Sequence, residues 1–467
     1  MVFSSLVFLY AFLPLVLLVY YLVPRRFRNL VLLVFSLLFY GWGEPKYVLL
    51  MVFSFSAAYA FGFSIAKYRV ENPRRARFWT LLSVSVSLLS LFFFKYYDFT
   101  AANLSHLPFW NLPLLGLRLP IGISFYTFQI LSYTLDLYRG NAELQRNYVR
   151  FGTYVSLFPQ LIAGPIVRYR EIAAELQERR ETVSDFAAGV ERFCIGLSKK
   201  VLLGDPLASG YLYFRESLAR SPSALAAWGQ VIFYAFHLYF DFSGYSDMAI
   251  GLGRMFGFRF PENFNYPYIA TSISDFWRRW HITLSSWFRE YVYIPLGGNR
   301  KGKWRQVRNL AIVWLLTGFW HGADWNFLLW GVYFLVLLLL ERFLLKDVLD
   351  ILPRFLRRFL TVFAVFLGFL LFSEQNLAVV WQTLGCLFGV NCGLGDALDF
   401  YHWKTLFPLL LIAAFCATPL PKRIFSAVLK RKKRFGVLRP AFCAFVLLLS
   451  TAFLVARSFS PFEYFQF

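Results

Sequence analysis

One histidine lies in the middle of a strongly apolar stretch. His321 is part of the sequence GFWHGADW, residues 318–325, within apolar residues that run from about Leu310 to Leu340. An imidazole costs free energy to bury, and in a membrane an ionisable residue is a functional candidate by default. The chemistry open to it is proton transfer, or nucleophilic attack that forms a covalent intermediate. The alternative is a buried ring that only hydrogen-bonds a neighbouring helix.

A second histidine follows an aromatic and basic segment. His281 ends the sequence FWRRWH, residues 276–281. The apolar residues from Ser274 onward recur at helical spacing, which predicts a helix with one apolar face that lies at a membrane interface or lines an entrance. Its residues Arg278 and Arg279 would attract a phosphate-bearing donor, because guanidinium groups bind phosphate oxygens bidentately. Contact with lipid headgroups is the alternative for both arginines.

Two carboxylates and several hydroxyls interrupt another apolar stretch. The sequence DFSGYSD, residues 241–247, contains Asp241 and Tyr245. Buried charges at this density normally need partners. Asp241 and Tyr245 are therefore candidates either for orienting the histidines or for anchoring helices.

The elements that must position these residues are membrane helices. The chain is 58% hydrophobic and 21% aromatic, with many apolar runs long enough to cross a hydrocarbon core of ~30 Å. This composition predicts an all-α, polytopic integral membrane protein with roughly ten to twelve spanning or half-spanning helices. We expect them to surround a central tunnel, because broken backbone at membrane depth needs protein or a watery cavity around it. No linker divides the chain, so we expect one domain over residues 1–467. The expected runs are residues 2–23, 30–40, 48–66, 78–94, 121–138, 154–167, 226–251, 310–320, 327–340, 359–372, 406–417 and 441–456.

The basic residues indicate an orientation. The net charge of +22 comes from 48 Lys and Arg against 26 Asp and Glu, and it is concentrated between the apolar runs. By the positive-inside rule these clusters are cytoplasmic if both the N-terminus and the C-terminal Phe467 lie outside. The alternation with spanning helices argues against nucleic-acid binding, which favours one continuous basic stripe. The clusters are residues 25–28, 74–77, 146–150, 301–308, 354–358 and 422–434.

The same orientation places His321 deep in the membrane. A helix from Asn309 to Trp320 would climb ~18 Å at 1.5 Å per residue. Residues 322–324 then supply a break, and Asp324 is a suitable N-cap for a second helix that starts near Trp325. Broken backbone at this depth needs protein or a watery cavity around it, and residues 158–167 carry a similar proline- and glycine-containing break.

Several chemistries lack their sequence signals. The chain has no Walker motif, no dinucleotide fingerprint and no His-Glu-x-x-His, and its five cysteines form no C-x-x-C pair. We therefore expect neither a bound cofactor nor a metal ion. Cys386 and Cys392 fall in a predicted outer segment. An oxidising compartment would allow a disulfide between them, and the sequence does not decide whether it forms.

The motifs together resemble those of the membrane-bound O-acyltransferase family. Within that family the similarity is to the membrane subunits of bacterial alginate O-acetyltransferases. It extends over essentially the whole chain, is densest over residues 120–331 and is weakest over residues 376–404. The matching segments are residues 121–126 (IGISFY), 241–247 (DFSGYSD), 276–281 (FWRRWH) and 320–322 (WHG), and for the subunit type residues 1–5, 293–300 and 461–467.

The resemblance implies acyl transfer from a cytosolic thioester, acetyl-CoA, towards an extracytoplasmic acceptor. His321 would be the central catalytic residue, either as a base or as an acyl-bearing nucleophile, and His281 a second essential residue nearer the cytosolic mouth. Support of the site or binding of the donor would fall to Asp241, Tyr245, Arg278, Arg279 and Trp320.

The resemblance also implies a bacterial inner, or cytoplasmic, membrane and a separate hydrolase-like acetyltransferase partner outside it, docked against the C-terminal Phe-Gln-Phe end. The acceptor would be a polysaccharide such as alginate, cellulose or peptidoglycan. Two alternatives stay open: a D-alanyl transferase of teichoic acids that uses a carrier protein, and a non-enzymatic polysaccharide or lipid transporter. The sequence LGGNR, residues 296–300, favours the first function over D-alanyl transfer, and no internal repeat typical of transporters is evident.

Overall fold

The computed structural model describes residues 1–107, 112–431 and 438–456, and within them the regular elements are helices. This confirms the predicted all-α fold. The chain packs into two compact units, Met1–Phe193 with Asp247–Pro261 and Cys194–Ser246 with Glu262–Phe467. The single-domain assignment stays a prediction. The predictions for residues 457–467, which include the motif at 461–467 and an outside C-terminus, lie beyond the described residues.

The first unit is built from the N-terminal helices, where η marks a 3-10 or π-helical turn. Two later helices, α10 (Val183–Ser198) and α12 (Ala224–Met255), contribute residues to both units. The other elements are η1 (Phe8–Phe12), α1 (Leu13–Leu22), η2 (Arg25–Phe27), α2 (Arg28–Gly43), α3 (Tyr47–Glu71), α4 (Pro73–Lys95), α5 (Tyr97–Leu104), α6 (Ile123–Arg139), α7 (Tyr148–Ser156), α8 (Phe158–Leu161) and α9 (Tyr169–Gln177).

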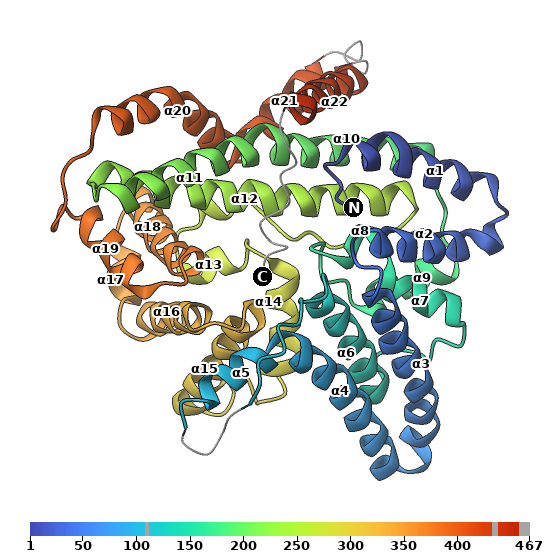
Figure 1. The fold of residues 1–467 in the computed structure, drawn as a ribbon. Coiled ribbons are helices and arrows are strands. Elements are labelled where there is room, and N and C mark those ends of the chain that lie inside the picture. The colour runs from blue at the N-terminus through green and yellow to red at the C-terminus, as the bar shows by residue number, and fades with distance from the viewer. Residues whose placement is uncertain (108–111, 432–437, 457–467) are drawn as a thin grey trace. The chain divides into compact units, whose positions relative to one another are not determined.

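Helices α3, α4 and α6 pack against one another (Figure 1). Helix α4 begins with Pro73, which suits the first helical position, and Asn72 caps it by accepting a hydrogen bond from a backbone N–H at 3.1 Å. Helix α6 follows Gly122, which has a φ of 77°, and a side-chain carbon at this position would lie 2.9 Å from the Leu161 carbonyl oxygen. Both features require glycine. The break predicted within residues 158–167 is confirmed, because the short α8 is followed by non-helical backbone.

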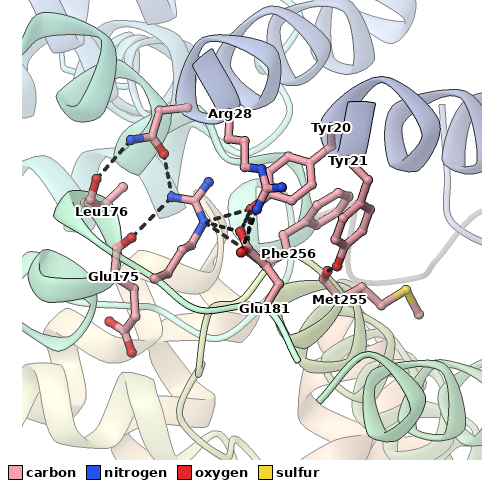
Figure 2. Close-up of polar contacts among 10 residues, drawn as sticks. Tyr20, Tyr21, Arg28, Glu175, Leu176, Glu181, Met255 and Phe256 are labelled. Carbon is pink, nitrogen blue, oxygen red and sulfur yellow. Dashed lines mark hydrogen bonds and ion pairs between the residues drawn. The ribbon is translucent and has the colours of Figure 1, made fainter. Parts of the chain in front are cut away.

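A buried ion-pair cluster around Glu181 joins distant parts of the first unit (Figure 2). Glu181 pairs with Arg28 at 2.6 Å and accepts a hydrogen bond from the Tyr20 hydroxyl at 2.5 Å. Arg179 donates to the Phe256 carbonyl at 3.0 Å. Burial alone would raise the pKa of Glu181, but the hydrogen bonds from Tyr20 and Arg28 hold that pKa below its usual value. The cluster therefore holds the ends of α1 and α12 beside the segment after α9.

The second unit contains the remaining helices. Its elements are η3 (Lys199–Gly204), α11 (Asp205–Arg220), η4 (Pro267–Ile269), α13 (Ile273–Trp277), α14 (Ile282–Phe288), η5 (Arg289–Tyr293), α15 (Lys303–His321), α16 (Trp325–Phe343), α17 (Lys346–Ile351), α18 (Arg354–Ser373), α19 (Leu377–Leu387), α20 (Ala397–Cys416), α21 (Leu420–Arg431) and α22 (Leu438–Ala456). Cys386 and Cys392 are free thiols, and the Cys392 thiol donates to the Cys386 carbonyl at 3.7 Å.

Helices α15 and α16 pack closely through two glycines. A side-chain carbon on Gly318 would lie 2.4 Å from the Phe327 carbonyl oxygen, and one on Gly331 would lie 2.5 Å from the Trp314 carbonyl oxygen. Because both obstacles are backbone atoms, only glycine allows this approach. Helix α18 packs on the other side of α16 (Figure 1). The three helices hold the chain on both sides of His321.

Five helices in the described residues are long and apolar enough to cross a membrane: α3, α4, α16, α18 and α22. A sixth candidate is α20 together with the start of α21, bent by 71° at the break between them. Other expected spans correspond to helices that are shorter, such as Phe8–Leu22, or that contain more polar residues. Helix α15, for example, begins with Lys303, Arg305 and Arg308. The prediction of a multi-pass membrane protein is confirmed. The described residues contain fewer long apolar helices than the ten to twelve spanning or half-spanning helices that the sequence predicts.

Candidate active site

His321 is the last residue of α15 and lies among aromatic rings. Its side chain is buried, and the imidazole is 5.0 Å from the Trp330 ring and 5.2 Å from the Phe372 ring, measured between centroids, with both rings nearly perpendicular to it. These contacts come from α16 and α18. The surroundings therefore exclude water from most of the imidazole and fix its plane.

The helix ends at His321 for local reasons. Gly322 is fully extended, with φ −162° and ψ 157°, and Asp324 accepts a hydrogen bond from the N–H of Trp325 at 2.6 Å to cap α16. The predicted break and N-cap are both confirmed. The imidazole thus sits at a discontinuity of the backbone between two helices.

The structure brings the two predicted histidines to the same aromatic ring. The Trp320 ring centroid lies 5.0 Å from that of His321 and 6.1 Å from that of His281. Phe242 of α12 packs perpendicular to the His281 ring at 4.8 Å. Both histidines are buried. Residues far apart in the sequence therefore form one site in the second unit.

One sequence prediction is wrong at His281. We expected a continuous helix through residues 274–284, but α13 ends at Trp277 and α14 starts at Ile282. His281 itself is left-handed, with φ 46° and ψ 54°. The reason is a competing backbone pairing: the Ile282 N–H donates to the Asn263 carbonyl at 3.0 Å, and the Asn265 N–H donates to the Arg279 carbonyl at 2.9 Å. Hydrogen bonds to the segment before α13 thus replace the hydrogen bonds that a continuous helix would make.

Asn263 fixes the proton on the His281 ring. The N–H of Thr283 can only donate, and it lies 3.3 Å from the Asn263 Oδ1, so this atom is the amide oxygen. The same oxygen lies 3.1 Å from the His281 Nδ1, which must therefore carry the proton. The Asn263 Nδ2 donates to the Ser246 Oγ at 3.1 Å. The lone pair of the neutral ring is then on Nε2.

The ring of His281 is also kept neutral by its surroundings. His281 lies between α13 and α14, outside the candidate membrane spans, and burial lowers its pKa to about 3. Because the charged form is disfavoured, Nε2 stays available as a hydrogen-bond acceptor or base across the neutral range.

Asp241 takes part in a buried ion-pair group on α12. Its Oδ1 lies 2.6 Å from the Nζ of Lys200, which also pairs with Asp205 at 2.8 Å, and none of the three side chains is appreciably exposed. These contacts match the helix-anchoring alternative. Tyr245 is buried one turn further along α12. That either residue supports the histidines stays a prediction.

The two adjacent arginines have different surroundings. Arg279 pairs with Asp275 at 2.9 Å and donates to the Asn265 carbonyl at 3.3 Å. Arg278 is exposed and lines a cleft of about 610 Å³ between α13, α16, α17 and α18. The two arginines look equivalent in the sequence, but Arg279 forms an ion pair within its own segment, whereas Arg278 lines a basic cleft.

Comparison with known proteins assigns the family. The pattern of the membrane-bound O-acyltransferase family matches residues 145–381, which include both histidines and Trp320. The chain belongs to this family. It is therefore an O-acyltransferase, and the predicted enzyme class is confirmed.

Relatives of this O-acyltransferase match it from end to end. It is 40% identical over 508 aligned residues to a probable alginate O-acetylase of Azotobacter vinelandii, with 100% of both chains aligned. It is 32% identical to a peptidoglycan O-acetyltransferase of Helicobacter pylori, over 100% of this chain and 98% of the relative. A teichoic acid D-alanyltransferase of Bacillus subtilis is 30% identical over 56% of this chain and 68% of its own length.

Several contacts of the O-acyltransferase site were not predicted from the sequence. Asn263 lies in an irregular segment with no helical period to mark it, and Lys200 is a buried lysine in a run that otherwise looks like a solvated helix end. Phe242, Trp330 and Phe372 are single aromatic residues among many. Phe242 lies in the segment 241–247 that the sequence singled out, but not among the polar residues chosen from it, and no pattern marks the other four. Each of the five acts through a contact with a distant segment.

Proposed function

We propose that this enzyme moves an acetyl group from cytosolic acetyl-CoA through the membrane for O-acetylation of a polysaccharide outside the cell. The observation that supports this most strongly is the end-to-end similarity to a probable alginate O-acetylase, combined with a buried His321 at the end of α15. The acceptor class follows from the names of two full-length relatives, which concern alginate and peptidoglycan.

The proposed orientation places the basic start of α15 in the cytosol. Arg308 and His321 lie on one helix, separated by ~20 Å at 1.5 Å per residue. With Arg308 at the inner surface of the bacterial cytoplasmic membrane, His321 lies well inside a hydrocarbon core of ~30 Å. A donor that enters from the cytosol and an acceptor that enters from outside would then meet at the break after α15.

The chemistry assigned to His321 is acyl transfer. As a base, a neutral imidazole takes the proton from an acceptor hydroxyl while the hydroxyl oxygen attacks the thioester carbonyl. The C–S bond then breaks, and the proton passes from the imidazolium to the departing thiolate. As a nucleophile, the imidazole nitrogen attacks first and displaces the thiolate, and the acceptor oxygen then removes the acyl group from the ring. Both routes consume one thioester and one hydroxyl and release one thiol.

D-alanyl transfer from a carrier protein is the second candidate. The similarity to a teichoic acid D-alanyltransferase favours it, because that match reaches 30% identity over 277 aligned residues. It extends over little more than half of this chain, whereas the O-acetylase match extends over all of it. Acetyl transfer therefore ranks first.

Thioester turnover by the protein in vesicles tests this proposal. We expect release of free thiol from acetyl-CoA when the cytosolic face is accessible, as in inverted vesicles, and little release in sealed right-side-out vesicles. A D-alanylated carrier protein is the comparison donor. Turnover of the carrier alone would replace the acetyl proposal with D-alanyl transfer, and turnover only in right-side-out vesicles would overturn the orientation.

We also propose a separate hydrolase-like acetyltransferase at the outer face, which places the acetyl group on the polymer. The resemblance to the membrane subunits of bacterial alginate O-acetyltransferases, which implies such a partner, supports this proposal. Deleting the partner gene should leave acetyl-CoA consumption measurable in membranes while acetyl esters disappear from the isolated polymer. Polymer that keeps its normal acetyl content in the deletion strain would reject the partner.

A further inference from the structure

A cleft lined by basic residues lies beside the first half of α15, on the side of the helix start and away from His321. Its volume is about 610 Å³, and it is bounded by the start of α13, the end of α16, α17 and the start of α18. Four of its lining side chains are cations: Arg278, Arg342, Lys346 and Arg357. Two lining side chains, Glu341 and Asp350, are acidic. The lining is therefore basic overall.

The acidic side chains offset part of that charge and leave an excess of cations. The carboxylate of Glu341 accepts hydrogen bonds from the backbone N–H groups of Ile273 at 2.5 Å and Ser274 at 3.2 Å, at the start of α13. Asp350 lies 3.9 Å from Arg357 and is largely exposed. In the described part of the chain, Arg278, Arg342 and Lys346 make no ion pair. The cleft therefore holds more cations than carboxylates, and three of its four cations make no ion pair with a described residue.

The contrast between Arg278 and Arg279 indicates what the cleft selects. Arg279 is held by Asp275, four residues earlier on the same segment. Arg278 instead lines a surface that it shares with arginines from α16 and α18. Guanidinium groups gathered from separate helices suit a ligand with several oxygen atoms on one anionic group, such as a phosphate or pyrophosphate.

The cleft also lies at a suitable distance from His321. Leu310 lines it and belongs to α15, roughly three turns before His321, or about 17 Å along the helix axis. An extended pantetheine arm, which separates the phosphates of a thioester donor from its sulfur, is of comparable length. Phosphates held beside Leu310 would thus bring the thioester to about the level of His321 along the helix axis.

We propose that this cleft binds the phosphate-bearing end of the thioester donor and so sets the donor's affinity. The inference rests on the proposed function, because it requires a soluble donor with phosphate groups. An anionic lipid headgroup has the same chemistry and is the competing occupant.

The test compares acetyl-CoA with S-acetylpantetheine, which has the same arm and thioester but lacks the phosphates and the adenosine. In the double variant Arg278→Gln/Arg342→Gln we expect the KM for acetyl-CoA to rise about tenfold or more, with kcat and the KM for S-acetylpantetheine unchanged. Arg358→Gln is the matched control, because Arg358 neighbours Arg357 on α18 but does not line the cleft. It should leave both KM values as they are.

Three outcomes separate the ideas. An equal rise in KM for both donors, or no rise for either, overturns the cleft as a phosphate site. Turnover of neither donor by the unaltered protein overturns the proposed function instead. Reconstitution in purely zwitterionic vesicles tests the lipid: if the effect of the double variant appears only when phosphatidylglycerol is present, the occupant is a headgroup and the donor proposal falls.

Discussion

Replacing His321 by alanine should reduce kcat for acetyl-CoA-dependent transfer by about 10³-fold or more, because the change removes the group that moves the proton or carries the acyl group. The KM for acetyl-CoA should change little, since the proposed phosphate contacts belong to a cleft whose lining residue on α15, Leu310, lies about 17 Å before His321 along the helix axis. The measurement is steady-state thiol release by purified protein in lipid.

Folding must be controlled in this experiment, because His321 packs against Trp330 and Phe372. His321→Gln keeps most of the volume and should be as inactive as the alanine variant. His402→Ala is the matched control: His402 stacks on Tyr213 in the same unit and is half-buried, and its loss should leave kcat within a few-fold of normal. Substantial activity in well-folded His321→Gln would remove His321 from the chemistry.

Replacing Asn263 by leucine should lower kcat by roughly 10²-fold, even though Asn263 is a positioning residue for His281. Leucine has a similar volume but offers no acceptor to the His281 Nδ1–H, so the ring can take the other tautomer or turn. General acid–base groups typically contribute about 10²- to 10⁴-fold, and loss of the correct tautomer removes that contribution. Steady-state kinetics with acetyl-CoA provide the measurement.

Asn263→Asp separates positioning from packing. A carboxylate also accepts from Nδ1–H, so this variant should recover most of the activity lost in Asn263→Leu. Its negative charge favours the imidazolium and raises the pKa of His281, whereas the proposed role of this ring as a base needs the neutral form. As the pH is lowered, the variant should therefore lose activity at a higher pH than the unaltered protein does.

The control for both variants is Asn265→Leu. It makes the same chemical change two residues away on an exposed side chain, while the backbone bond from Asn265 to Arg279 is kept. Its kinetics should match those of the unaltered protein. A pH profile in Asn263→Asp that coincides with the normal one would show that Asn263 does not act through the His281 ring.

Much of the architecture could be predicted from local sequence. The break after His321 and the cap at Asp324 follow from nearest neighbours, since glycine and an N-cap aspartate act within one helical turn. The long apolar runs predicted the membrane helices, because the hydropathy of a run is likewise a property of contiguous residues. The prediction of a continuous helix through His281 was wrong. Backbone hydrogen bonds to residues 263 and 265, which precede this segment in the chain, replace hydrogen bonds within the expected helix.

Contiguous residues were enough to predict the fold class and the family and to select the two histidines as candidate site residues, because composition, helical period and short motifs are local properties. Helix packing was needed to establish that Trp320 stands beside both histidines, that Asn263 sets the His281 proton, and that Arg278 joins a basic cleft while Arg279 does not. Those relations depend on side chains from separate helices, whose packing no local pattern in one sequence encodes.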